Sequence, residues 1–176
     1  EISRIWHEAP DKIEKSTTTL TQGLRARAKA DARGAMPEDL PTRAAKTLSE
    51  HIDLQKGGLQ GAPKFPQPFL YQFLWQQAQL DADPNSRDAV LVTLEKICQG
   101  GMYDHIGGGF ARYSVDADWL VPHFEKMLYD NALLVQLMTQ VWRDTKSPLL
   151  AARIEETLDW VRNEMTLANG AFAASL

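Results

Sequence analysis

The chain has 176 residues, of which 44% are hydrophobic and 24% are charged. This composition is ordinary for a folded globular protein and excludes the disordered and fibrous classes. The net charge of −4 gives none of the basic surface that nucleic-acid binding requires, so we expect no nucleic-acid partner. A single cysteine, Cys98, excludes an intrachain disulfide and any paired-cysteine redox or zinc motif.

No apolar run is long enough to cross a membrane, and the first residues lack the basic-then-apolar pattern of a signal peptide. We therefore expect no membrane partner and a cytoplasmic location, which the scarcity of cysteine also suits. The sequence begins with Glu1 instead of methionine, which indicates a chain cut from a longer protein.

Apolar residues recur at helical spacings of three and four through most of the chain. This periodicity predicts helices at residues 11–30, 42–55, 67–80, 86–99, 122–143 and 148–166. Thr42 is the expected N-cap of the second helix, while Pro122 and Pro148 open the fifth and sixth, because proline is tolerated in a first turn. Short gaps between the paired helices predict helical hairpins.

Glycine followed by an apolar or aromatic residue comes after every second predicted helix. The loops are Gly57-Gly58-Leu59, Gly100-Gly101-Met102-Tyr103 and Asn169-Gly170-Ala171-Phe172. Their recurrence at one phase of the hairpin repeat predicts an all-α fold, a partial (α/α) toroid of the six-hairpin glycosidase-like type with about three helical hairpins. The alternative is an irregular helical bundle with ordinary glycine caps. We expect roughly the first half of a toroid, whose exposed hairpin edges favour a homodimer.

The stretch from Gly100 to Asn131 holds most of the residues able to do chemistry, and it reads GGMYDHIGGGFARYSVDADWLVPHFEKMLYDN. It includes a loop of about 20 residues, a length that is usually functional in a compact helical protein. On a helix that begins at residue 122, His123, Lys126 and Asp130 share one stripe that continues into apolar residues. Such a stripe faces either a hydrogen-bonded structural network or a ligand pocket, and the sequence leaves both open.

Several familiar catalytic motifs do not fit this stretch. His105 begins a His-Ile-Gly-Gly-Gly segment similar to an esterase oxyanion loop, but the chain has no G-x-S-x-G nucleophile. His105 and His123 lack the close spacing of zinc ligands, so we expect no metal and no cofactor. Histidine is a candidate acid or base near neutral pH, and Glu125 with Asp104 or Asp130 is a candidate carboxylate pair for glycosidic chemistry.

Three segments resemble one family, namely residues 58–66 (GLQGAPKFP), 100–116 (GGMYDHIGGGFARYSVD) and 119–134 (WLVPHFEKMLYDNALL). They are similar to the thioredoxin-domain-containing proteins related to spermatogenesis-associated proteins. The resemblance implies a thioredoxin-like domain followed by a six-hairpin toroid similar to N-acylglucosamine 2-epimerases. Residues 1–40 are then a connecting helix after a missing thioredoxin-like domain, and the first toroid helix, while residues 41–176 form the first part of the toroid.

The leading hypothesis is therefore a carbohydrate-binding or sugar-isomerising toroid segment whose ligand is a sugar or another small molecule. The candidate catalytic residues are His105, His123 and Glu125. The candidate substrate-binding residues are the stacking aromatics Tyr103, Phe110 and Trp119 and the polar residues Asp104, Arg112, Lys126 and Asp130. Two alternatives stay open: a non-enzymatic helical scaffold that docks a thioredoxin-like domain or another protein, and glycoside hydrolysis. We expect the segment alone to be inactive.

Overall fold

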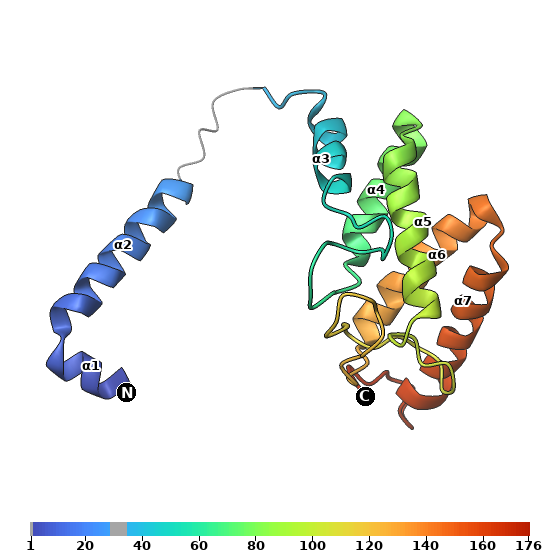
Figure 1. The fold of residues 1–176 in the computed structure, drawn as a ribbon. Coiled ribbons are helices and arrows are strands. Elements are labelled where there is room, and N and C mark those ends of the chain that lie inside the picture. The colour runs from blue at the N-terminus through green and yellow to red at the C-terminus, as the bar shows by residue number, and fades with distance from the viewer. Residues whose placement is uncertain (1, 29–34) are drawn as a thin grey trace. The chain divides into compact units, whose positions relative to one another are not determined.

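The computed structural model describes residues 2–28 and 35–176 and divides into two compact units, Glu1–Pro37 and Glu38–Leu176. The first unit contains helices α1 (Ile2–Glu8) and α2 (Pro10–Ala28) (Figure 1). The periodicity predicts α2 but not α1, and positions 29 and 30 of the predicted helix lie outside the described residues. No α2 residue is buried. That residues 1–40 connect two domains and supply the first toroid helix stays a prediction.

The second unit is a group of packed helices with their connecting loops (Figure 1). Its elements are α3 (Leu40–Ser49), α4 (Pro68–Asp81), α5 (Pro84–Gln99), α6 (Leu128–Thr145), α7 (Pro148–Trp160) and the π-helix η1 (Val161–Met165). Helices α4 and α5 form one hairpin and α6 and α7 another, while α3 packs on α4 and α5. Within the described residues the chain forms isolated β-bridges but no strand, which confirms the all-α prediction.

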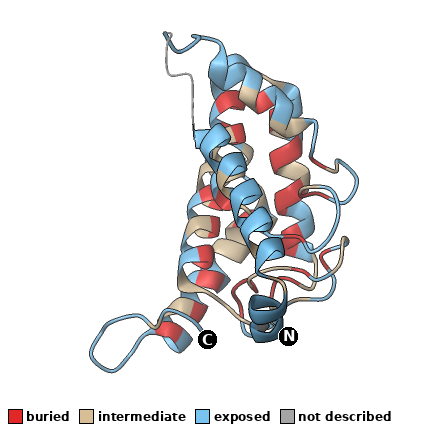
Figure 2. Ribbon diagram, turned by 90° about the vertical axis from the view of Figure 1, so that its left-hand side faces the viewer, coloured by how far each residue is buried: buried red, intermediate tan, exposed pale blue. Residues whose placement is uncertain are grey.

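Buried apolar residues run as stripes along the helices of this unit, and exposed residues cover the other faces (Figure 2). The stripes are Tyr71, Leu74 and Trp75 on α4, Ala89, Val90, Leu94, Ile97 and Cys98 on α5, and Leu134, Leu137, Met138 and Val141 on α6. Their spacing of three, four and seven residues places them on one side of each helix. The periodicity that predicts the helices also predicts which side is buried.

Side chains before the helices fix where α5 and α7 begin. The Asp83 carboxylate accepts hydrogen bonds from the backbone N–H groups of Asn85 and Ser86, at 3.1 Å each. Ser147 accepts from the Leu150 N–H at 3.4 Å. Each cap satisfies N–H groups that have no partner inside the helix.

The second predicted helix is wrong at both ends. Helix α3 begins at Leu40 behind the N-cap residue Asp39, so Thr42 lies inside it and its hydroxyl donates to Asp81 at 2.9 Å. The helix ends at Ser49, not at residue 55, because the chain turns back on itself and Ile52 forms a β-bridge with Leu59.

The fifth predicted helix begins six residues too early. His123 and Lys126 therefore lie outside the helix and do not share a helical stripe with Asp130. Helix α6 starts at Leu128, and the segment before it is extended. The N–H of His123 donates to the Tyr113 carbonyl at 2.9 Å, and the N–H of Lys126 donates to the Leu176 carbonyl at 3.1 Å. These partners lie far away in sequence, so helical periodicity could not reveal them. The sixth predicted helix is found as α7 followed by η1.

Each of the three loop regions contains one turn closed by an antiparallel β-bridge; in the second region this turn spans residues 104–109 and follows the predicted loop Gly100-Gly101-Met102-Tyr103. The bridges join Ile52 to Leu59, Tyr103 to Phe110, and Thr166 to Phe172. The loops follow α3, α5 and η1, so they occupy the same phase of the helical order, as the sequence predicts.

Candidate functional site

The loop after α5 folds into a tight turn organised by Asp104. The Asp104 N–H donates to the Gly109 carbonyl at 3.0 Å, and the Gly108 N–H donates to the Asp104 carbonyl at 2.9 Å. One carboxylate oxygen, Oδ1, accepts from the N–H groups of Ile106 and Gly107, both at 2.9 Å. An aspartate that caps its own turn in this way supplies backbone partners that helices and sheets supply elsewhere.

Lys126 ties this turn to the chain segment before α6. Its ammonium donates to the second Asp104 oxygen, Oδ2, and to the Gly108 carbonyl, at 2.8 Å each, and lies 5.1 Å from the centre of the Trp160 ring. The Gly107 N–H bond and the Lys126 contact lower the pKa of Asp104 to about 2. The polar groups of both side chains are therefore occupied within the protein.

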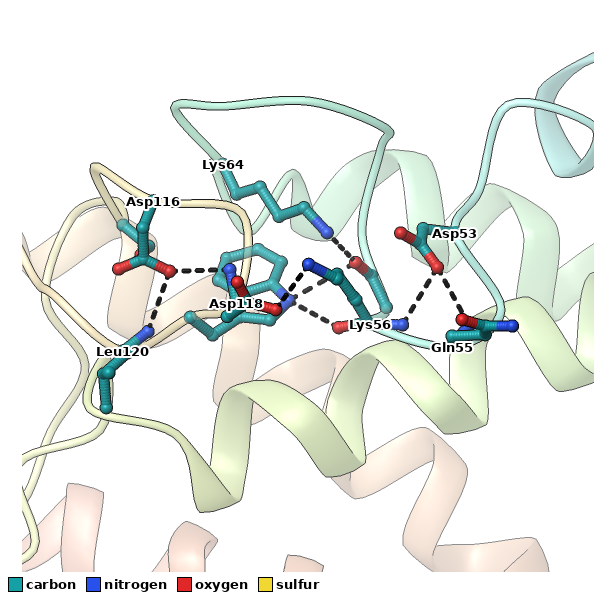
Figure 3. Close-up of polar contacts among 10 residues, drawn as sticks. Asp53, Gln55, Lys56, Lys64, Asp116, Asp118 and Leu120 are labelled. Carbon is teal, nitrogen blue, oxygen red and sulfur yellow. Dashed lines mark hydrogen bonds and ion pairs between the residues drawn. The ribbon is translucent and has the colours of Figure 1, made fainter.

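The same turn also occurs earlier in the chain, in the loop after α3 (Figure 3); in chain order this is the first copy, and the Asp104 turn is the second. The Asp53 N–H donates to the Gly58 carbonyl at 2.9 Å, and the Gly57 N–H donates to the Asp53 carbonyl at 2.7 Å. The Lys64 ammonium donates to the Gly57 carbonyl at 2.5 Å and lies 5.6 Å from the Trp119 ring centre. Lys64 is only 3% exposed, and this burial lowers its pKa. The two copies share one sequence signal, an aspartate four residues before paired glycines, on which none of the sequence predictions rests.

Residues 116–120, between α5 and α6, contact this first copy and stabilise it (Figure 3). The Lys56 ammonium pairs with Asp118 at 2.7 Å, and the Trp119 indole N–H donates to the Lys56 carbonyl at 3.0 Å. Asp116 accepts the N–H groups of Asp118 and Leu120, at 2.6 Å and 3.2 Å. Trp119 is fully buried by these contacts, so its ring has no face open for stacking on a ligand.

A polar network connects the second turn to α7. The Arg153 guanidinium donates to Glu156 Oε2 at 2.7 Å, contacts His105 Nδ1 at 3.4 Å and lies 4.2 Å from the Tyr103 ring centre. The Tyr103 hydroxyl donates to the same Glu156 oxygen at 2.5 Å. This hydrogen bond is the main cause of the lowered pKa of Glu156, while burial and then the Glu156 contact raise the pKa of Tyr103.

Both ring nitrogens of His105 have partners in this network. A guanidinium offers only donors, so His105 Nδ1 accepts from Arg153. The proton then sits on Nε2, which donates to the Gly100 carbonyl at 2.9 Å. Arg153 and Glu156 were missed by the sequence analysis, because two charged residues three apart on a helix look like an ordinary surface pair.

A cleft of about 380 Å³ lies between this turn and the segment before α6. It is lined by Gly101, Met102, Tyr103, Asp104, His105, Ile106, Ala111, Pro122, Phe124 and Lys126. Phe124 is 89% exposed and Ile106 is fully exposed, so the mouth of the cleft is apolar. Phe124 is not among the residues predicted from the sequence, although an aromatic residue between His123 and Glu125 indicates a candidate stacking surface for a ligand.

Six of the predicted site residues lie outside this cleft, namely the aromatic residues Phe110 and Trp119 and four polar residues. The His123 ring stacks on Tyr113 with 4.7 Å between ring centres, and Arg112 pairs with Glu125 at 3.1 Å. Asp130 is buried at the start of α6, and this burial raises its pKa. The structure thus brings Tyr103, Asp104, His105 and Lys126 together and places the other polar candidates elsewhere.

Phe110 has a structural position in the core. It is fully buried, and its backbone N–H and carbonyl both bond to the Asn131 side chain, at 2.7 Å and 3.0 Å. Asn131 itself is fully buried on α6. Like Trp119, Phe110 therefore offers no exposed ring face. Tyr103 is also buried, but it is among the residues that line the cleft.

Among residues 2–28 and 35–176, no three His, Cys, Asp or Glu side chains stand close enough together to hold a metal ion. In the same ranges, no helix is long and apolar enough to cross a membrane.

No protein-family model matches the chain. It is 32% identical over 175 residues to spermatogenesis-associated protein 20 of Mus musculus, which covers 95% of this chain and 22% of that protein. The protein of the same name from Homo sapiens is 32% identical over 179 residues, covering 97% and 23%. The chain thus spans about a fifth of the length of these relatives. The resemblance to spermatogenesis-associated proteins is confirmed, while the thioredoxin-like domain stays a prediction.

Two solved structures share the fold. A sugar epimerase from a ruminal bacterium superposes with a TM-score of 0.66 at 14% identity, over 74% of this chain and 36% of that chain. Cellobiose 2-epimerase from Spirochaeta thermophila superposes with a TM-score of 0.62 at 18% identity, over 80% and 41%. These likenesses confirm the predicted fold class, a partial (α/α) toroid.

Proposed function

We propose that this chain supplies part of the sugar-binding rim of an epimerase-like toroid, and that the cleft beside Asp104 holds the sugar. One observation carries the proposal: a ligand-sized cleft opens where two chain segments meet at the glycine loops. Its volume of about 380 Å³ lies within the range of roughly 300–1,000 Å³ that is typical of small-molecule sites. The epimerase-like fold supports a sugar as the ligand but does not identify it.

The cleft offers the two kinds of contact that a sugar needs. The exposed ring of Phe124 is a flat apolar surface for the C–H face of a pyranose. The polar residues His105, Asp104 and Lys126 also line the cleft, and a sugar hydroxyl would share or replace one of their present hydrogen bonds. Asp104 and Lys126 form an ion pair that joins the turn after α5 to the segment before α6. Because this pair fixes the separation of the two sides of the cleft before a ligand binds, less conformational entropy is lost on binding.

His105 is the proposed proton carrier for sugar isomerisation in the longer protein. It is the histidine among the residues that line the cleft. For Nε2 to accept a proton from the ligand, the ring proton must first move from Nε2 to Nδ1, so the contact of Nδ1 with Arg153 must break. His123 and Glu125 are not retained in this role, because they are engaged with Tyr113 and Arg112 outside the cleft.

The test is titration of the 176-residue chain with glucose, mannose and N-acetylglucosamine, followed by calorimetry and by NMR of the backbone amides. We expect shifts at Ile106 and Phe124, and a loss of affinity of about tenfold in Phe124→Ala, because the variant loses the aromatic contact surface. Phe172→Ala is the matched control, since Phe172 is an exposed phenylalanine on another glycine loop and does not line this cleft. Equal effects of the two substitutions, or no binding of any sugar, would overturn the proposal.

A protein-docking scaffold is the second candidate, and the exposure of Ile106 favours it. An isoleucine that is fully exposed beside an 89% exposed phenylalanine is typical of an interaction surface. The thioredoxin-like domain implied by the family resemblance is the proposed partner. Ile106→Ser would weaken such docking, and a pure docking scaffold would bind no sugar in the titration above, so these two measurements together separate the candidates.

Glycoside hydrolysis receives less support from the geometry. It requires two carboxylates on opposite sides of the scissile bond. Asp104 is the carboxylate among the residues that line the cleft, and Lys126 already occupies it.

The predicted homodimer also stays a proposal. On α4, Phe69 is 64% exposed and Leu80 is 76% exposed, and a second copy is able to cover them. Sedimentation velocity at several concentrations tests this directly: we expect a dimer whose population falls on dilution and is absent in the double variant Phe69→Ser, Leu80→Ser. A monomer at all concentrations contradicts it.

A further inference from the structure

A second cleft adjoins the first on the other side of the Asp104 turn. It has a volume of about 250 Å³ and is lined by Tyr103, Asp104, His105, Ile106, Gly107, Gly108, Glu156, Asp159, Trp160 and Asn163. The two clefts share the four residues from Tyr103 to Ile106. The smaller volume lies below the roughly 300 Å³ at the lower end of ligand pockets. The second cleft is therefore the size of a subsite and not of a separate site.

Glu156 lines the second cleft with a carboxylate whose orientation is fixed and whose second oxygen is available to a ligand. Its Oε2 atom accepts from Tyr103 and from Arg153, so the carboxylate cannot rotate freely. Its other oxygen, Oε1, accepts no hydrogen bond from the described part of the chain, and the side chain is 48% exposed. A carboxylate oxygen held in place with free lone pairs is a strong acceptor for a hydroxyl group.

Arg153 is the residue that positions Glu156. Its side chain is only 16% exposed, and its three nitrogens contact the Cys98 carbonyl, Glu156 and His105. A planar guanidinium with all its nitrogens engaged has one orientation. The network therefore places the acceptor of the second cleft at a fixed distance from His105, which lines both clefts.

We propose that the two clefts are adjoining subsites of one site, that the ligand is a disaccharide or glycoside with two linked rings, and that Glu156 accepts a hydroxyl of the second ring. The first ring lies against Phe124 in the larger cleft. The linkage crosses the turn at His105 and Ile106, and the second ring enters the smaller cleft toward Glu156. This inference rests on the proposed function, because it assumes that the larger cleft holds a sugar.

The experiment compares each monosaccharide with its own disaccharide on the 176-residue chain, by calorimetry: glucose with cellobiose, mannose with mannobiose, and N-acetylglucosamine with chitobiose. We expect one disaccharide to bind about tenfold tighter than its monosaccharide, the gain of one hydrogen bond to a charged group. Glu156→Gln should remove this gain and leave the monosaccharide affinity unchanged. Glu155→Gln is the matched control, since Glu155 is the exposed neighbour on α7 that lines neither cleft.

A second variant keeps the proposal testable if Glu156→Gln disturbs the network. Asn163 is exposed on η1 and, of the two clefts, lines only the smaller one, so Asn163→Trp fills that cleft while Arg153, Tyr103 and Glu156 all keep their own side chains. It should lower the disaccharide affinity to that of the monosaccharide. Equal affinities of every pair in the unchanged chain, or equal losses for both sugars in the variants, would overturn the two-subsite inference alone. Absence of binding by all six sugars would overturn the proposed function as well.

Discussion

Gly109 offers a quantitative test of how the Asp104 turn, the second copy, is packed. Its backbone φ is +81°, and a Cβ atom built there would lie 2.7 Å from Cδ2 and from Cε3 of the Trp160 ring. Carbon atoms pack best at about 3.5–4.0 Å, so the ring or the turn must move. Gly109→Ala therefore combines a left-handed backbone cost of about 1–2 kcal/mol with an overpacking cost of about 1–3 kcal/mol. We expect a total loss of roughly 2–5 kcal/mol in the free energy of unfolding.

Gly170 is the matched control for this substitution. Its φ of +82° is nearly the same, but a Cβ atom there meets nothing within 4 Å. Gly170→Ala should therefore cost only the backbone part, about 1–2 kcal/mol. Urea unfolding followed by helical circular dichroism measures both variants. The two losses should differ by about 1–3 kcal/mol, and Trp160→Leu should remove most of that difference. Equal losses would refute the argument that the ring, and not the backbone, limits this position.

Three further substitutions test separate parts of the structure. Asn131→Ala leaves the buried N–H and carbonyl of Phe110 without partners, and should lower the free energy of unfolding by about 2–6 kcal/mol, measured by urea titration. Asp83→Ala removes the α5 cap and should cost about 0.5–2 kcal/mol in the same assay. The pKa of Asp104 is lowered to about 2, chiefly by the Gly107 N–H bond, so its ionised form stabilises the fold above about pH 4 and this contribution is lost toward pH 2. The stability gap between the unchanged chain and Asp104→Asn should therefore close over that range.

Each of these predictions has an outcome that contradicts it. An Asn131→Ala loss no larger than that of Gln136→Ala, an exposed amide on the same helix, would mean that Phe110 finds other partners. An Asp83→Ala variant as stable as the unchanged chain would mean that the cap is replaced by solvent. A gap for Asp104→Asn that persists unchanged at pH 2 would mean that the side chain acts through its shape and not through its charge.

Local sequence patterns predicted most of the helices because local interactions determine them. The predicted 67–80 and 86–99 match α4 and α5 within two residues, and the Asp83-Pro84 pair marks the boundary between them. The predicted start at Pro122 failed for the opposite reason. Proline and apolar spacing are compatible with a helix there, but long-range backbone pairing with residues 113 and 176 takes the N–H groups away. Local propensity lost to tertiary hydrogen bonding.

The sequence predicted which segment contains the candidate site, but not how its side chains are arranged in space. The stretch from Gly100 to Asn131 does contain the cleft, since its glycines and polar residues mark an ordered, irregular loop. The partners that give the cleft its chemistry come from elsewhere: Arg153 reaches His105 across 48 residues. No periodicity or spacing relates two such positions, so only the fold brings them together.

A comparison of the two copies of the turn, after α3 and after α5, shows which residues the turn requires and which occur only at the candidate site. Both copies keep the aspartate, the paired glycines, a lysine on the glycine carbonyl and a tryptophan against the second glycine. The position after the aspartate differs, being Leu54 in the first copy and His105 in the second. The first copy folds without a histidine, so the turn itself does not require one. His105, with Arg153 and Glu156 behind it, is therefore an addition to the structural unit, and it is this addition that lines the clefts.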